Sequence, residues 1–233
     1  MIIRVKFTKL GYLKYLSHLD LVRLFTRAFS KADLPVKYTE GFNPHPKFSM
    51  GNPLSLGIES LAEYMELELS ESMSPGELKQ RLNSVLPEGI KISEAVESFE
   101  TSSLSSQIRW SHYEIRLWME DGSDKKTFSE KLEKWDGIQS IIIDKKKKKG
   151  KNKISVRVDI KPLIGNLQFK GFDDEGFAIL STLLKTGEEG NLKPSELAEA
   201  MDVHLKLGID LEMTHITRLD VFTEVEGQLG KPI

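Results

Sequence analysis

The residues best suited to chemistry lie between positions 15 and 63, where two histidines, a row of cations and a proline-rich loop occur close together. The loop is the run EGFNPHPK, residues 40–47, in which His45 stands between two prolines. Each proline fixes its own φ and favours extended geometry in the residue before it, so the loop is expected to be stiff and to present His45 and Lys47. So constrained a loop indicates a binding role for the histidine.

A helix with one cationic side is expected just before this loop, from about residue 17 to residue 32. Ser17 is a suitable N-cap, and Asp20 three positions later completes an acidic version of the capping box. Basic residues then recur every four positions and form one row along the exposed side of the helix. They are Arg23, Arg27 and Lys31.

The region supplies nine candidate binding residues. They are His18, Asp20, Arg23, Arg27, Phe42, Asn43, His45, Lys47 and Glu63. Arg27 and Lys47 would contact an anion, and His18 would hydrogen-bond a phosphate or pack against the loop. Phe42 would stack on a nucleobase, as would Tyr12 and Tyr15.

Simpler roles compete with binding for several of these residues. A cap and an i, i+3 ion pair are favoured for Asp20 and Arg23. Core packing is favoured over stacking for Phe42. Glu63, which opens a strand, is expected to neutralise Arg27 or Lys47 in the free protein.

The net charge of −2 conceals a strong separation of charge along the chain. Residues 1–47 are rich in lysine and arginine, residues 48–100 are rich in glutamate, and a second basic cluster follows later. Its members are Lys145, Lys146, Lys147, Lys148, Lys149, Lys151 and Lys153. Such fields attract anionic partners, which makes these lysines candidate RNA contacts. A solvated hairpin tip is an equally weighted interpretation.

Composition excludes several other classes of site. The chain has no cysteine, which removes disulfides, thiolate nucleophiles and cysteine-ligated clusters, and its five histidines lack metal-ligand spacing. No nucleotide-binding glycine motif or serine-hydrolase motif is present. No apolar run reaches the roughly 20 residues that span a bilayer, and the N-terminus alternates like a strand. We expect a cytoplasmic protein without a cofactor or metal of its own.

The order of expected elements over residues 1–100 is β-α-β-β-α-β, the ferredoxin-like arrangement. A serine-rich linker is expected at 101–110, a second unit with a similar element order and a lysine-tipped hairpin at 111–225, and a tail at 226–233. The predicted fold is therefore α+β, with two ferredoxin-like units in tandem. A single large α+β domain is the alternative, because no sequence repeat links the halves.

The runs SHLD (17–20), EGFNPHPK (40–47), GNLKP (190–194) and ITR (216–218), with Glu63, resemble a bacterial family of unknown function called radical-SAM-linked proteins. Its members are encoded beside radical SAM proteins or fused to their C-terminal ends. The resemblance implies a radical SAM partner. Because three cysteines hold the cluster of such an enzyme and this chain has none, the partner would carry the iron–sulfur cluster and S-adenosylmethionine.

Three functions remain open from the sequence. The first, which we favour, is a non-catalytic adaptor that binds RNA or a ribonucleoprotein and serves the radical SAM partner. The second is a metal-independent endoribonuclease-like enzyme in which His45 or His18 performs acid–base chemistry and Lys47 or Arg23 stabilises developing charge. Its fold would resemble that of CRISPR repeat-processing endoribonucleases. The third is an adaptor that binds protein alone.

Overall fold

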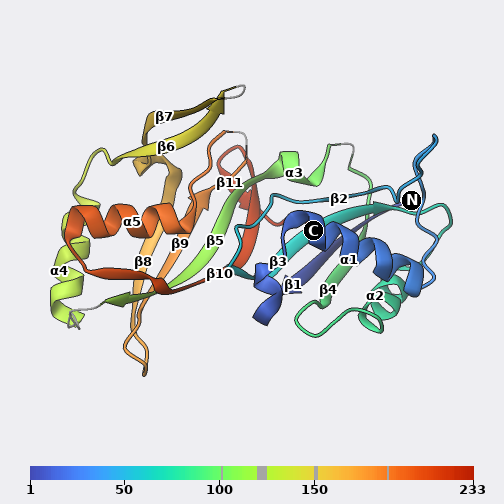
Figure 1. Ribbon diagram of the computed structural model, residues 1–233, viewed down its shortest axis with the longest axis horizontal. Coiled ribbons are helices and arrows are strands. Elements are labelled where there is room, and N and C mark those ends of the chain that lie inside the picture. The colour runs from blue at the N-terminus through green and yellow to red at the C-terminus, as the bar shows by residue number, and fades with distance from the viewer. Residues whose placement is uncertain (101, 120–124, 150–151, 188) are drawn as a thin grey trace. The chain divides into compact units, whose positions relative to one another are not determined.

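A computed structural model describes residues 1–100, 102–119, 125–149, 152–187 and 189–233. Within these ranges, only the backbone is described for residues 125, 146–149, 152 and 153. The chain divides into two compact units, coloured along the chain in Figure 1. Unit 1 comprises Met1–Ser111 and Thr217–Ile233, and unit 2 comprises His112–Ile216. Both units combine strands with helices, so the fold is of the mixed α+β class.

Unit 1 opens with the expected order of strands and helices. Its elements are β1 (Ile2–Lys9), the 3-10 helix η1 (Gly11–Tyr15), α1 (His18–Lys31), β2 (Phe48–Met50), β3 (Glu59–Glu68), α2 (Pro75–Asn83), β4 (Ile92–Ser98) and α3 (Leu104–Gln107). The capped helix predicted at Ser17 is confirmed, because the serine side chain accepts the backbone N–H of Asp20. Ser74 caps α2 in the same way, through the N–H of Glu77. Between α1 and β2, Val36 and Tyr38 form isolated antiparallel bridges, to Leu69 and Pro46.

The sheet of unit 1 is built around β1 and β3. β1 pairs antiparallel with β3 on one side and with β4 on the other. β2 pairs antiparallel with the second half of β3, and β10 (Ile209–Val225) runs parallel to its beginning, with Thr217 opposite Glu59. The short strand β11 (Gln228–Gly230) pairs with β10.

Both faces of this sheet are covered. Ile3, Val5 and Phe7 form one core with the apolar sides of α1 and α2. On the opposite face Tyr64 packs with a second cluster that includes residues of α3 and β10. The alternation of β1 is therefore not that of a strand with one side in water.

Unit 2 holds the central part of the chain. Its elements are the greater part of β5 (Ile108–Met119), α4 (Lys125–Asp136), β6 (Ile142–Lys149), β7 (Asn152–Asp159), the 3-10 helix η2 (Lys161–Leu163), β8 (Ile164–Phe172), β9 (Ala178–Lys185), α5 (Pro194–Leu205) and the first half of β10. Strands β5, β9 and β8 are neighbours in one sheet, and β6 and β7 form a separate antiparallel pair.

The division of the chain differs from the expected one at three places. The expected linker 101–110 contains α3 and the start of β5. Residues 217–225 and the expected tail 226–233 belong to unit 1. Asp220 bonds to Lys6 of β1 and Tyr64 of β3, and Arg4 of β1 donates to the Pro232 carbonyl. Strand β8 was not predicted; its glycines weaken the strand pattern.

Candidate functional site

A cleft of about 520 Å³ follows the exposed side of α1 and contains the predicted cationic row. We call it the helix cleft. Its lining residues are Leu16, Asp20, Arg23, Leu24, Arg27, Ala28, Lys31, Val85 and Pro87. The floor is apolar and the rim carries three cations, so the cleft suits an anionic ligand with an apolar part.

The N-terminal end of the row is already neutralised. Asp20 closes the capping box with Ser17, and its Oδ1 lies 3.3 Å from Nη1 of Arg23. The hydrogen bond that the Ser17 hydroxyl donates to Asp20, 2.6 Å long, lowers the pKa of the carboxyl. The cap and the ion pair favoured from the sequence are both present. His18, the first residue of α1, is exposed.

The C-terminal part of the row is available for a ligand. Arg27 and Lys31 are exposed, and within the described part of the chain neither side chain makes a hydrogen bond or an ion pair. An α-helix rises about 1.5 Å per residue, so the row from Arg23 to Lys31 spans about 12 Å. Two unpaired cations at this spacing can bind successive phosphates of one strand.

The EGFNPHPK run forms the tip and one side of a narrow loop between α1 and β2. We call residues 38–46 the finger. Thr39 and His45 close its base: the Thr39 N–H donates to the His45 carbonyl at 2.9 Å, and the His45 N–H donates to the Thr39 hydroxyl at 3.1 Å. The same hydroxyl lies 3.1 Å from Nδ1 of His45. The stiffness expected from the prolines therefore has a second source in this clamp.

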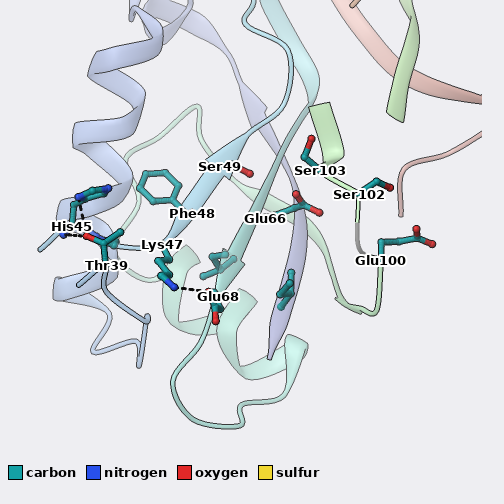
Figure 2. Close-up of a pocket in the computed structure, with 13 residues that line it drawn as sticks. Thr39, His45, Lys47, Phe48, Ser49, Glu66, Glu68, Glu100, Ser102 and Ser103 are labelled. Atoms are coloured by element: carbon teal, nitrogen blue, oxygen red, sulfur yellow. Dashed lines mark hydrogen bonds and ion pairs between the residues drawn. The ribbon is translucent and has the colours of Figure 1, made fainter. Parts of the chain in front are cut away.

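A second cleft, of about 440 Å³, lies beside the finger and is shown in Figure 2. His45 and Lys47 line it together with residues of β2 and β3 and with Glu100, Ser102 and Ser103. The Lys47 ammonium lies 3.5 Å from Glu68, which is also ion-paired with Lys37. The hydrogen bond from Lys37, with the nearby charge of Lys47, lowers the pKa of Glu68. Lys47 is thus already paired, which weakens its expected role as an anion contact.

Phe42 corrects one expectation. Core packing was favoured for this residue, but its side chain is fully exposed at the tip of the finger. The whole segment 40–45 is exposed, and Gly41 next to the ring has a φ of 123° with open space around it. The chain turns outward at this glycine, and no core lies within reach of Phe42. Asn43 is exposed beside it.

The position of Glu63 corrects a second expectation from the sequence. It was expected to neutralise Arg27 or Lys47, but it is buried in β3 and forms an ion pair with Arg218 of β10. Lys9, also buried, donates to the carbonyl of Lys14 at 3.4 Å, and burial lowers the pKa of its ammonium despite the nearby Glu63. The physical reason is the register of the sheet, which places Glu63 opposite Phe7 on the helix-covered face.

Sequence reasoning missed a buried polar network on the opposite face. Asp220 accepts hydrogen bonds from the Tyr64 hydroxyl at 2.8 Å and from the Lys6 ammonium at 3.0 Å, and Arg4 pairs with Glu66 at 2.8 Å. Burial would raise the pKa of Asp220, but the bonds from Tyr64 and Lys6 outweigh it, and the pKa is lowered. Arg4 and Lys6 alternate with apolar residues along β1, a pattern that predicts exposed side chains, so the sequence did not indicate that they are buried.

The lysine cluster is only partly described. Lys145 lies within β6, where its ammonium pairs with Glu196 at 2.7 Å and donates to the Asn191 carbonyl at 2.5 Å. Lys146, Lys147, Lys148 and Lys149 also belong to β6 and Lys153 to β7, the antiparallel pair that forms the expected hairpin, with Lys148 opposite Lys153. Lys151 lies outside the described residues. Lys145 is therefore an internal contact of unit 2.

The described residues contain neither a metal-binding cluster nor a membrane-spanning helix. No cluster of three or more histidine, aspartate or glutamate side chains there is arranged to hold a metal ion. None of the helices is sufficiently long and apolar to cross a membrane.

Comparison with known proteins identifies the family. Residues 3–194 match the family described as "Uncharacterized protein conserved in bacteria (DUF2344)". The match covers most of the chain, so this protein belongs to that family. No curated protein matches the chain.

The fold has a counterpart among solved structures. A chain of the "Crystal Structure of a Cbf5-Nop10-Gar1 Complex" superposes with a TM-score of 0.52 at 7% sequence identity. The match covers 96% of this chain and 50% of the solved chain, so the protein spans half the length of its structural counterpart. At this identity the likeness concerns the fold alone.

Proposed function

We propose that this protein is a non-catalytic adaptor that binds single-stranded RNA along the helix cleft of unit 1. The observation that carries the proposal is the pair Arg27 and Lys31, two exposed cations without a partner among the described residues, on the rim of a cleft with an apolar floor. Phosphates would bind the cations, and bases or sugars would rest against Leu24 and Val85. Single-strand binders combine a basic groove with aromatic stacking surfaces, and here the aliphatic floor would take the place of the rings.

The catalytic alternative has less support. Lys47 is paired with Glu68, and Nδ1 of His45 is held by the Thr39 hydroxyl. His18 does not line the cleft beside His45. An acid–base mechanism would need two groups on the reacting atoms, and the described contacts bring no such pair together.

We also propose a radical SAM partner, for which the support is the resemblance of the SHLD and EGFNPHPK runs. Because the chain has no cysteine, the cluster would reside in that partner. Its site of action would be the cytoplasm. We further propose that unit 1 is ferredoxin-like, supported by its antiparallel strand order β4-β1-β3-β2 with two helices on one face.

Salt dependence of RNA binding tests the main proposal. The affinity of the 233-residue chain for a fluorescein-labelled 12-mer of uridine is measured by anisotropy between 50 and 300 mM KCl. Each phosphate contact on a single strand contributes about 0.7 to the slope of log K against log salt. Arg27→Gln and Lys31→Gln should each reduce the slope by about that amount.

The matched control is Lys134→Gln, an exposed helical lysine of α4 in unit 2, which should leave the slope unchanged. Absence of binding by the unaltered chain at 50 mM KCl would overturn the proposal. Binding with an unchanged slope in both cleft variants would also overturn it, because the RNA would then lie elsewhere.

A further inference from the structure

The finger displays three flat rings to solvent. Phe42 is fully exposed, Tyr38 is 46% exposed, and His45 is also exposed. The remaining residues between Thr39 and Pro44 are polar, glycine or proline. A single exposed phenyl ring is ordinary on a protein surface, but three rings carried by one constrained loop are available to stack on a ligand.

The support of these rings is preorganised. Besides the Thr39–His45 clamp, the Lys47 N–H donates to the Lys37 carbonyl at 2.7 Å, and both ammonium groups reach Glu68 of β3. Pro44 and Pro46 restrict the backbone between these points. A ring on such a support sacrifices little conformational entropy on binding, unlike a ring on a frayed loop.

The composition of the finger favours a nucleobase over an apolar protein pocket. Protein interfaces surround an aromatic anchor with further apolar side chains, and the finger has no exposed aliphatic neighbour for Phe42 between residues 39 and 43. Proteins that recognise single-stranded RNA instead stack bases on Phe, Tyr or His rings and hydrogen-bond their polar edges. The exposed amide of Asn43 can both donate and accept hydrogen bonds with a base edge.

The chain connects this element directly to the helix cleft. The cationic row runs toward the C-terminal end of α1, and the segment that contains the finger leaves from that end (Figure 1). We propose that the finger binds an unpaired base, which stacks on Phe42, in the same RNA strand whose phosphates lie along α1. This inference rests on the proposed function and narrows its substrate to RNA with unstacked, accessible bases.

Substitutions at Phe42 test the inference in the 12-mer assay. Stacking of one base is worth roughly 1–3 kcal/mol by alanine substitution, so Phe42→Ala should weaken binding by roughly 5-fold to 150-fold. The salt slope should not change, because no phosphate contact is removed. Phe99→Ala is the matched control, because Phe99 is 86% exposed in unit 1 but lies outside the finger. The RNA affinity of this variant should stay within twofold of that of the unaltered chain.

A second variant gives a direct signal. Phe42→Trp should retain affinity, and its added tryptophan emission, measured against the unaltered chain, should be quenched on RNA binding. The stacking role would be overturned if Phe42→Ala kept the affinity of the unaltered chain, or if the tryptophan emission of Phe42→Trp were not quenched by RNA. Either result would leave the proposed function intact and would indicate a protein pocket as the partner of Phe42. Absence of RNA binding by the unaltered chain would overturn both.

Discussion

Replacing Glu63 with glutamine should destabilise unit 1 more than replacing its partner Arg218 with methionine. Glu63 and Arg218 form a buried ion pair, with side chains 10% and 4% exposed, and the buried Lys9 interacts with both. Glu63→Gln leaves two buried cations without this carboxylate. Arg218→Met leaves Glu63 with Lys9, which preserves a balance of charge.

The magnitude follows from the cost of breaking a buried pair. Removing one partner costs about 3–5 kcal/mol, because the other charge stays buried and uncompensated. We expect about that loss for Glu63→Gln and less than about 3 kcal/mol for Arg218→Met, where Lys9 still compensates the carboxylate. With a urea m-value of about 2 kcal/mol/M, a loss of about 4 kcal/mol lowers the unfolding midpoint by about 2 M.

Urea titration at pH 7, followed by circular dichroism, measures both variants. Hydrogen exchange of the β1 amides assigns the loss to unit 1. Glu88→Gln, an exposed carboxylate replaced in the same way, is the control and should stay within about 0.5 kcal/mol. A midpoint for Glu63→Gln equal to or above that of Arg218→Met would refute the assignment of Glu63 as the compensating charge.

Three further predictions concern other contacts of unit 1. The pKa of Asp220 is lower in the folded state than in the unfolded chain, where it is about 4. The contribution of its carboxylate to the free energy of unfolding is therefore complete above about pH 4 and is lost as the pH falls below that value. Asp220→Asn should therefore be less stable at pH 7 and lose less on acidification, and equal acid losses in urea titrations from pH 7 to 3 would contradict this. Ser17→Ala should raise the pKa of Asp20, which a carbon-13 titration of the carboxyl measures; an unshifted pKa would show that the hydroxyl does not hold it. Gly89→Ala should cost more than about 1 kcal/mol, because its φ is 92° and a Cβ would lie 2.7 Å from the Leu10 carbonyl oxygen, whereas Gly76→Ala in α2, with open space, should cost nothing.

Local patterns predicted the local structure of unit 1 well. The serine that caps α1 and the spacing of the cationic row depend on residues within one or two helical turns. The stiffness expected of the EGFNPHPK loop agrees with the clamp at its base. Such features are visible in the sequence because their causes are short-range.

The partners of charged residues were decided by tertiary structure. The sequence placed Glu63 with Arg27 or Lys47, yet the sheet register gives it Arg218, 155 positions away. Arg4 and Lys6 alternate like surface residues but are buried, because α3 and the C-terminal segment cover their face of the sheet. Phe42 is an apolar residue that was expected in the core, but its side chain is exposed to solvent.

The sequence by itself therefore determined the helices, their caps, the cationic row and the rigid loop, since each follows from neighbouring residues. Only the tertiary structure decided which cations remain available to a ligand. Lys6, Lys47 and Lys145 form ion pairs with carboxylates, while Arg27 and Lys31 form none with the residues that the structure describes. The physical reason is that a carboxylate neutralises whichever cation the packed strands bring within a few ångströms, at any separation along the chain.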